Sequence, residues 1–128
     1  MHLLDTDVLV EVQRGRAAAA EWLSEFRSDI ALPAAVAWEM LIGSRSRIEL
    51  DRGKRFLSTF NVAQITPDDS RLVADLIGEY GLASGMSLPD FLIAAQAMNR
   101  DAVLFTFNLK HFQVVQGLNA QVPYDRIT

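Results

Sequence analysis

Three carboxylate residues that lie far apart in the chain are candidates for shared chemistry. Asp5 comes directly after two leucines, Glu39 is the only charged residue of an apolar stretch before Arg45, and Asp90 opens a second apolar stretch. Carboxylates that gather in one place repel and raise one another's pKa unless a cation lies between them. If the fold brings the three acids together, they predict a site for a metal ion.

The chain contains no cysteine, so any metal must be bound by oxygen or histidine ligands. Asn108, which follows the apolar segment 102–106, can add an amide oxygen to the three acids. A set of oxygen ligands without cysteine or histidine favours Mg²⁺ or Mn²⁺ over softer metals. One of these two ions is therefore the cofactor that the residue types predict.

Each of these acids also has an ordinary structural interpretation. Glu39, taken alone, is equally well explained as an exposed helix carboxylate. Asp90 follows Ser87 at the spacing of a capping box and, taken alone, is better explained as satisfying free amides at a helix start. Asp68 and Asp69 fit the start of another helix in the same way, so they are left out of the predicted site. Only the joint position of the three acids at the ends of buried elements favours a site.

The composition limits the class of protein. At 128 residues, of which 50% are hydrophobic, the chain is long enough for a single domain, 1–128, with its own core. No apolar run is long enough to span a membrane, and the N-terminus lacks the pattern of a signal peptide. The absence of cysteine mildly favours a reducing compartment. We therefore expect a soluble protein of the cytoplasm.

The net charge of −4 argues against a protein that coats nucleic acid by electrostatic attraction. A local basic patch remains open, because cationic residues are bunched in two stretches, 14–16 and 45–55. A solvated helix surface explains such runs more often than a binding site does. The charge pattern alone therefore assigns no partner.

Apolar segments with the lengths of strands and helices alternate along the chain. The predicted strands lie at 3–4, 30–32, 61–65, 102–106 and 118–124. The predicted helices begin after Asp7 as N-cap and continue at 16–27, 34–44, 49–60, 67–80 and 88–98, before a short turn or helix at 110–112. Strands that alternate with helices predict a parallel sheet with right-handed crossovers.

This alternation predicts an α/β fold of three layers, with a central, mostly parallel sheet of four to five strands. If the first and fourth strands flank the point where the strand order reverses, Asp5 and Asn108 lie at neighbouring strand ends. Glu39 and Asp90, which helices carry, would then face them. The predicted site lies at the carboxyl edge of the sheet, where ligands bind in parallel α/β proteins.

Four motifs, in sequence order, resemble those of the PIN-domain ribonucleases, and most closely those of the VapC-type toxins of bacterial toxin–antitoxin modules. The motifs are Leu3-Leu4-Asp5-Thr6-Asp7, Glu39 with Gly43, Gly81-Leu82 ahead of Asp90-x-x-Ile93-Ala94-Ala95, and Leu104-x-Thr106-x-Asn108-x-x-His111-Phe112. Together they span nearly the whole chain. The resemblance implies a PIN-like domain with Mg²⁺- or Mn²⁺-dependent endoribonuclease activity. It also implies a homodimer that a small VapB-like antitoxin silences, with the antitoxin's tail in the acidic site.

The resemblance also implies roles for single residues. Asp5, Glu39 and Asp90 map onto the family's three acids, so a metal held by Asp5 and Asp90 would activate water while Glu39 positions that water or a second ion. Thr106 and Asn108 would orient water or substrate. The candidates for contact with the RNA backbone are the cationic residues Arg14, Arg45, Arg47 and Lys110.

The sequence departs from the family pattern at three places. Asp7 stands where the family more often has Asn, so it is either an outer ligand of the metal or the N-cap of the first helix, and we expect the cap. Asn108 is neutral at a position that the family fills with Asp or Asn, which weakens a second metal position. Residues 34–37 lack the hydroxyl residue that often precedes the family's glutamate, and Glu39 therefore lacks that support.

Two other functions start from the same residues. Asp5-Thr6-Asp7 is similar to the first motif of haloacid-dehalogenase-type phosphatases, in which the first acid is the nucleophile and the second a general acid. That family expects a later lysine and paired acids near the last strands, and residues 104–108 hold no such pair. A catalytically inactive domain of the same fold, which only binds RNA or a protein partner, is the other alternative.

Overall fold

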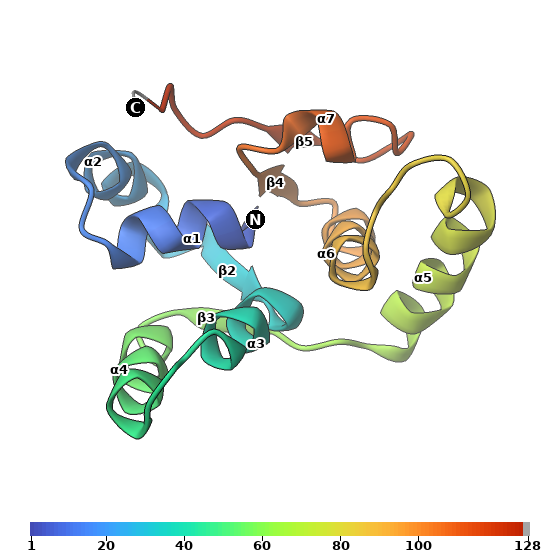
Figure 1. The fold of residues 1–128 in the computed structure, drawn as a ribbon. Helices are drawn as coiled ribbons and strands as arrows, with labels where there is room; N and C mark the ends of the chain where they lie inside the picture. Colours follow the sequence, from blue (N-terminus) through green and yellow to red (C-terminus); the bar gives the residue numbers. More distant parts are fainter. Residues whose placement is uncertain (127–128) are drawn as a thin grey trace.

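The computed structural model, which describes residues 1–126, contains one parallel sheet of five short strands (Figure 1). The strands are β1 (His2–Leu4), β2 (Ile30–Pro33), β3 (Asn61–Ala63), β4 (Val103–Phe105) and β5 (Ala120–Gln121). Their order across the sheet is β3-β2-β1-β4-β5, and every neighbouring pair is parallel. The predicted parallel sheet is confirmed, with β3 and β5 at its edges.

Helices connect successive strands and cover both faces of the sheet. They are α1 (Thr6–Gln13), α2 (Ala17–Phe26), the short 3₁₀ helix η1 (Arg27–Asp29), α3 (Ala34–Ile42), α4 (Arg47–Leu57), α5 (Pro67–Tyr80), α6 (Leu88–Asn99) and α7 (Leu109–Phe112). In Figure 1, the pairs α1–α2 and α3–α4 lie on one side of the sheet and the pair α5–α6 on the other. This arrangement confirms the predicted three-layer α/β fold. Within the described residues, none of the helices is both long and apolar enough to traverse a bilayer.

Two long helices begin where local sequence signals predict. Thr66 and Ser87 are the N-caps of α5 and α6, and their hydroxyl oxygens accept hydrogen bonds from the amides of Asp69 and Asp90. The carboxylates of Asp69 and Asp90 in turn accept from the amides of Thr66 and Ser87. Each helix thus starts with a complete capping box, which satisfies free amides at its first turn.

The first helix is capped by a different residue from the one predicted. Asp5, rather than Asp7, is the N-cap of α1, and its Oδ1 accepts a hydrogen bond from the amide of Thr6 at 2.7 Å. The prediction was wrong because the helix begins only one residue after β1, and Asp5 is that residue. Asp7 consequently lies inside the first turn of the helix.

Several other boundaries differ from the prediction by a few residues. α4 begins at Arg47 rather than at Glu49, because the hydroxyl of Ser46 accepts a hydrogen bond from the Glu49 amide at 3.1 Å and caps the helix there. β3 and β5 are shorter than the apolar segments that predicted them, since pairing with β2 and β4 covers only a few residues. These differences leave the order of elements unchanged.

The central strand β1 is completely buried where it approaches the site. Leu3 and Leu4 expose none of their surface, and they share one core with Leu32, Ile93 and Leu104 from the neighbouring elements. α6 is buried on most of its faces, as its apolar sequence predicts. Asp5 therefore follows a segment that packing holds in place on every side.

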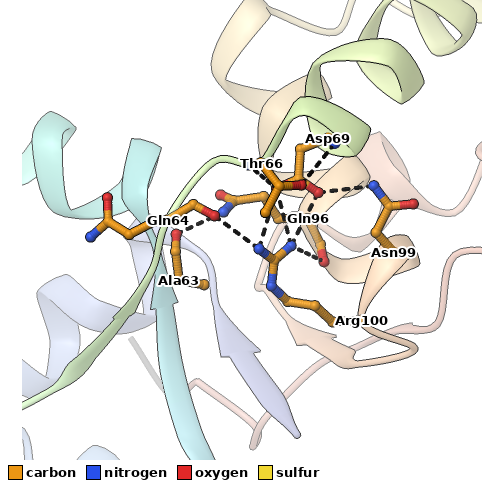
Figure 2. A network of polar contacts seen from close by, with 7 residues as sticks. All are labelled: Ala63, Gln64, Thr66, Asp69, Gln96, Asn99 and Arg100. Carbon is orange, nitrogen blue, oxygen red and sulfur yellow. Dashed lines mark hydrogen bonds and ion pairs between the residues drawn. The ribbon is translucent and has the colours of Figure 1, made fainter.

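A buried polar network fastens α6 to the connection between β3 and α5 (Figure 2). Asp69 is fully buried, and its carboxylate accepts hydrogen bonds from the Arg100 guanidinium at 3.1 Å and from the Asn99 side-chain amide at 2.9 Å. Arg100 also donates to the carbonyl of Gln64 at 2.9 Å. Burial opposes ionisation of Asp69, but the hydrogen bonds from Arg100, the Thr66 amide and Asn99, together with the charge of Arg100, hold the pKa of that carboxyl below its usual range. Asp69 therefore joins helices together and lies outside the site, as predicted.

Candidate active site

Asp5 lies at the carboxyl end of β1, at the point where the strand order reverses. β1 pairs with β2 on one side and with β4 on the other, and the chain reaches β4 only after it has passed through β3 at the far edge. The amide of Asp5 donates to the carbonyl of Phe105 at 2.9 Å, so Asp5 stays beside the end of β4. This is the position where ligands bind in parallel α/β sheets.

Both oxygens of the Asp5 carboxylate accept hydrogen bonds. Oδ1 accepts from the amide of Thr6 and Oδ2 from the hydroxyl of Thr106, each at 2.7 Å. The residue is only 8% exposed. Burial and then the negative charge of Asp7 raise the pKa of Asp5 from 3.8 to about 6, although the two hydrogen bonds act in the opposite direction. Asp5 is therefore a buried acid whose negative charge the protein only partly compensates.

Glu39 reaches the site from α3. The hydroxyl of Thr6 donates to its Oε1 at 3.4 Å, which links the glutamate to the residue next to Asp5. Burial raises the pKa of Glu39, and the charges of Asp5 and Asp90 raise it further. The three predicted acids are thus close enough for their charges to interact, as the sequence pattern led us to expect.

His111 joins Asp90 to Asn108. Its Nδ1 lies 3.3 Å from Asp90 Oδ2 and 2.9 Å from Asn108 Nδ2, while its Nε2 lies 3.2 Å from the carbonyl oxygen of Gly85. A neutral imidazole that donates from Nε2 to this carbonyl has Nδ1 free to accept from the Asn108 amide. The ring is therefore held on both sides, between α7, α6 and the loop that precedes α6.

Thr106 connects the two halves of the site. Its hydroxyl donates to Asp5 Oδ2, and its Oγ1 accepts from the backbone amide of Asn108 at 3.0 Å. Contacts consequently run without a break across the carboxyl edge of the sheet. We call this set the acid arc, and its members are Glu39, Thr6, Asp5, Thr106, Asn108, His111 and Asp90.

Asp7 is not the helix cap that the sequence led us to expect, and its role as an outer ligand of the metal stays a prediction. Its Oδ2 accepts a hydrogen bond from the backbone amide of Phe107 at 3.2 Å, so it ties α1 to the segment after β4. Its Oδ1 is buried and has no hydrogen-bond partner among the described residues. Burial raises the pKa of Asp7, and the nearby charge of Arg126 acts against this rise. Asp7 therefore lies behind the acid arc and raises the pKa of Asp5 through its charge.

Comparison with known proteins agrees with this geometry. A family model of the PIN domain matches residues 2–118. The chain belongs to the PIN-domain family. Ribonuclease VapC10 of Mycobacterium tuberculosis is 35% identical to this PIN domain over 120 residues, which cover 92% of this chain and 90% of the relative. Ribonuclease VapC19 of the same species is 36% identical over 128 residues, which cover 97% of this chain and 100% of the relative.

A solved structure described as a toxin–antitoxin complex from Klebsiella pneumoniae contains a chain similar to this PIN domain. The TM-score is 0.80 at 28% sequence identity, and the match covers 98% of this chain and 100% of that chain. The resemblance to VapC-type PIN domains that the sequence motifs indicate is thereby confirmed. The haloacid-dehalogenase alternative is not supported, because residues 2–118 match a different family.

The acid arc of this PIN domain fits a divalent metal ion in residue type and charge. Asp5 and Glu39 have pKa values raised by burial and neighbouring carboxylates, a repulsion that a bound cation relieves. Their oxygens and those of Asp90 are the ligands that Mg²⁺ and Mn²⁺ prefer. Across residues 1–126, no three His, Cys, Asp or Glu side chains lie close enough to hold an ion as they stand. Asp90 Oδ2 lies 3.3 Å from His111 Nδ1 and accepts a hydrogen bond from the amide of Ser87.

The structure divides the four cationic residues predicted to contact RNA. Arg14 and Arg45 line a groove that also reaches Glu39 of the acid arc. Arg47 does not line this groove and forms an ion pair with an acid one turn further along α4. Lys110 is exposed on α7, next to His111. A larger groove lies between α1, α2 and the C-terminal segment, and no residue of the acid arc lines it.

Sequence reasoning assigned no role to three residues at or near the site. Thr6 and His111 lie within quoted motifs, and in the structure Thr6 donates a hydrogen bond to Glu39 while His111 Nδ1 lies 3.3 Å from Asp90 Oδ2. The signal for His111 is its spacing of three from Asn108, which brings both side chains to one face of a helical turn. Arg52 lines the same groove as Arg14, but the phase of α4 cannot be read from a cluster of cations.

Proposed function

We propose that this PIN domain is a metal-dependent endoribonuclease of the toxin type, which a small antitoxin protein neutralises. The observation that carries the proposal is the acid arc, which gathers Asp5, Glu39, Asp90 and Asn108 at one edge of a parallel sheet. Two relatives named as ribonucleases match nearly the whole chain and support the same activity. The similar chain in a complex described as toxin–antitoxin supports an antitoxin partner.

Asp5, Asp90 and Glu39 are the residues that would hold the metal ion, Mg²⁺ or Mn²⁺. When bound, such an ion polarises water and offsets the negative charge that develops on a phosphate. Asp5 is fixed through both oxygens and defines the centre of the site. Glu39 is held only at Oε1, by Thr6, which leaves Oε2 to orient the attacking water.

Thr106 and Asn108 complete the site from the side of β4. The Thr106 hydroxyl fixes the Asp5 carboxylate and the Asn108 backbone at once, so the two strand ends keep one spacing. Asn108 is exposed and neutral, and it orients water or substrate without adding charge to the acids. Preorganised groups of this kind act mainly by positioning the reacting atoms.

A phosphatase mechanism with Asp5 as nucleophile is not favoured by the site. That mechanism needs Asp7 as a general acid facing the substrate. Here Asp7 Oδ2 accepts from the Phe107 amide, and its Oδ1 is buried. Both oxygens of Asp5 are also engaged in hydrogen bonds, which lowers their reactivity toward phosphorus.

The proposal includes a second copy of the chain and a cytoplasmic location. α3 exposes two large apolar side chains one turn apart on one face, Trp38 at 49% and Ile42 at 82% exposure. Apolar side chains grouped on a surface mark protein contacts, and a homodimer of PIN domains would cover them. The cytoplasm is where an RNA-cleaving toxin meets its substrate.

The decisive experiment maps the ends of cut RNA. Antitoxin-free protein is incubated with total RNA and Mn²⁺, with a chelator in a parallel sample. Water that attacks phosphorus in line leaves a 5′-phosphate and a 3′-hydroxyl, so we expect cuts at few sites whose 3′ ends a poly(A) polymerase extends directly. The chelator should abolish the cuts.

Three results contradict the proposal in different ways. Cyclic-phosphate ends or cutting in the presence of chelator would exclude a metal-dependent mechanism. Release of phosphate from small monoesters with intact RNA would indicate the phosphatase. Intact RNA with no release of phosphate would leave a domain that only binds RNA or a protein partner.

A further inference from the structure

A groove of about 410 Å³ beside the acid arc has a lining suited to phosphate groups. Helices α1, α3 and α4 form its wall, together with the turn that connects α3 to α4 (Figure 1). Thr6 and Glu39 of the acid arc belong to this lining. Three arginines, Arg14, Arg45 and Arg52, belong to it as well. The groove therefore connects the candidate active site to a cationic surface.

The three arginines come from different elements, so only the tertiary fold brings them together. Arg14 is the C-cap of α1, Arg45 lies in the turn between α3 and α4, and Arg52 lies on α4. α4 packs on α3, and a Cβ at Gly53 would lie 3.4 Å from Leu41 Cδ2, in ordinary van der Waals contact. The close packing of α4 on α3 places Arg52 at the groove.

The guanidinium groups that line the groove are not neutralised by the protein. Within residues 1–126, none of these three arginines forms an ion pair, whereas Arg47 and Arg100 do. Apart from Glu39, one acid lines the groove, Glu49. Its Oε2 accepts a hydrogen bond from the backbone amide of Arg45 at 2.7 Å, which makes it part of the cap of α4. Cationic side chains thus outnumber anionic ones along the groove.

We infer that this groove binds the phosphates of a single-stranded RNA next to the cleaved bond, with Arg14, Arg45 and Arg52 as the contacts. The inference rests on the proposed ribonuclease function, because a strand whose phosphate lies at the acid arc continues into the groove at Glu39. A planar guanidinium offers two parallel donors that match a phosphate. Phosphate contacts fix the path of the strand and carry no sequence information, so the choice of cleavage site must come from other contacts.

The test measures the salt dependence of RNA binding in protein that cannot cleave. In an Asp5→Asn background, the affinity for short oligo(U) and oligo(A) strands is measured over a range of salt concentrations. Each phosphate contact to a single strand contributes about 0.7 to the slope of log affinity against log salt. We expect Arg52→Gln to reduce the slope by about 0.7 and the triple Arg14, Arg45 and Arg52 variant by about 2, with the same loss for both strands.

Arg55→Gln is the matched control, because Arg55 lies on the same helix, is exposed, and does not line the groove. The control should keep the slope of the parent protein, and thermal melting should show that all variants are folded. A slope that falls equally in the control and in Arg52→Gln overturns the inference. Unchanged RNA binding together with lost affinity for the antitoxin also overturns it, because that result assigns the groove to a protein segment.

The outcome for the parent protein separates this inference from the proposed function. If the Asp5→Asn protein binds neither oligonucleotide and the wild-type protein leaves RNA intact, the ribonuclease proposal fails, and the inference fails with it. If the wild-type protein cleaves RNA and the Asp5→Asn protein binds it, while the groove variants match the Asp5→Asn protein in slope, only the assignment of the groove is wrong.

Discussion

Replacing Asp5 by asparagine should make the metal-free protein more stable at neutral pH while it abolishes activity. The pKa of Asp5 rises from 3.8 in the unfolded chain to about 6 in the folded protein. One pKa unit corresponds to about 1.4 kcal/mol, so the ionised carboxylate lowers the free energy of unfolding by about 3 kcal/mol. Because Asp5 is 8% exposed, solvent screens little of this effect.

The gain is smaller than this figure, because asparagine cannot reproduce both hydrogen bonds of the carboxylate. Its Oδ1 can accept from the Thr6 amide, but the Thr106 hydroxyl then loses its acceptor, at a cost of about 1 kcal/mol. We therefore expect Asp5→Asn to raise the free energy of unfolding by about 2 kcal/mol at pH 7.5.

The sign of the effect depends on pH. The folded state binds the proton of Asp5 more tightly than the unfolded state does, so the wild-type contribution to stability is complete below pH 3.8. It is lost as the pH rises through about 6. The gain in the free energy of unfolding of Asp5→Asn should therefore develop as the pH rises from 4 to 6. At pH 4 there should be no gain, because only the cost of losing the Thr106 hydrogen bond is left.

Urea unfolding with a chelator present, at pH 4 and at pH 7.5, measures this difference. Asp75→Asn removes one charge from an exposed position on α5 and serves as the control. A gain of the same size at both pH values would show that ionisation of Asp5 is not its cause. The absence of a gain at pH 7.5 would show that folding does not disfavour ionisation of the Asp5 carboxyl.

Four other outcomes follow from the site and the core. Millimolar Mg²⁺ or Mn²⁺ should raise the melting temperature of the wild-type protein and not that of Asp5→Asn, and an equal rise in both would place the metal elsewhere. Expression of the protein should arrest growth, and Asp90→Ala should relieve the arrest. The variant should stay folded, because losing the helix cap lowers the free energy of unfolding by only about 1 kcal/mol, and continued arrest by the folded variant would remove Asp90 from the site. His111→Ala should lower the affinity for the metal ion by about 10- to 100-fold, which the metal dependence of the melting temperature measures. An unchanged dependence would mean that His111 has only a structural role. Arg100→Ala should lower the free energy of unfolding by about 3–5 kcal/mol, because it leaves the buried Asp69 unpaired, and a loss no greater than that of the exposed-pair variant Arg71→Ala would contradict this.

Much of the fold was predictable because its signals are local. The capping residues Thr66 and Ser87 mark the starts of α5 and α6, and the apolar run of α6 indicates a helix buried on most sides. The proximity of Asp5 and Asn108 follows from the rule that places sites where the strand order reverses. The predicted extent of 1–128 for one domain and the catalytic role of each acid stay predictions.

What escaped prediction depends on partners that lie far away in the sequence. Asp7 resembles a helix cap, but its carboxylate bonds to the amide of Phe107, a hundred residues later. Arg47 and Arg52 look alike in the sequence, and only the packing of α4 on α3 decides which of them lines the groove. Local patterns contain no information on either choice.

The separation of Asp5 and Thr106 has a consequence for synthesis on the ribosome. Their hydrogen bond spans 101 residues, and β1 can be flanked on both sides only after β4 has formed. A nascent chain therefore carries Asp5 and Glu39 early but lacks the strand that holds them in register, since contacts of such long range form late in folding. The active site would thus stay incomplete while the chain is being translated. An antitoxin that is already present could meet the chain at the moment when the last strands close around β1.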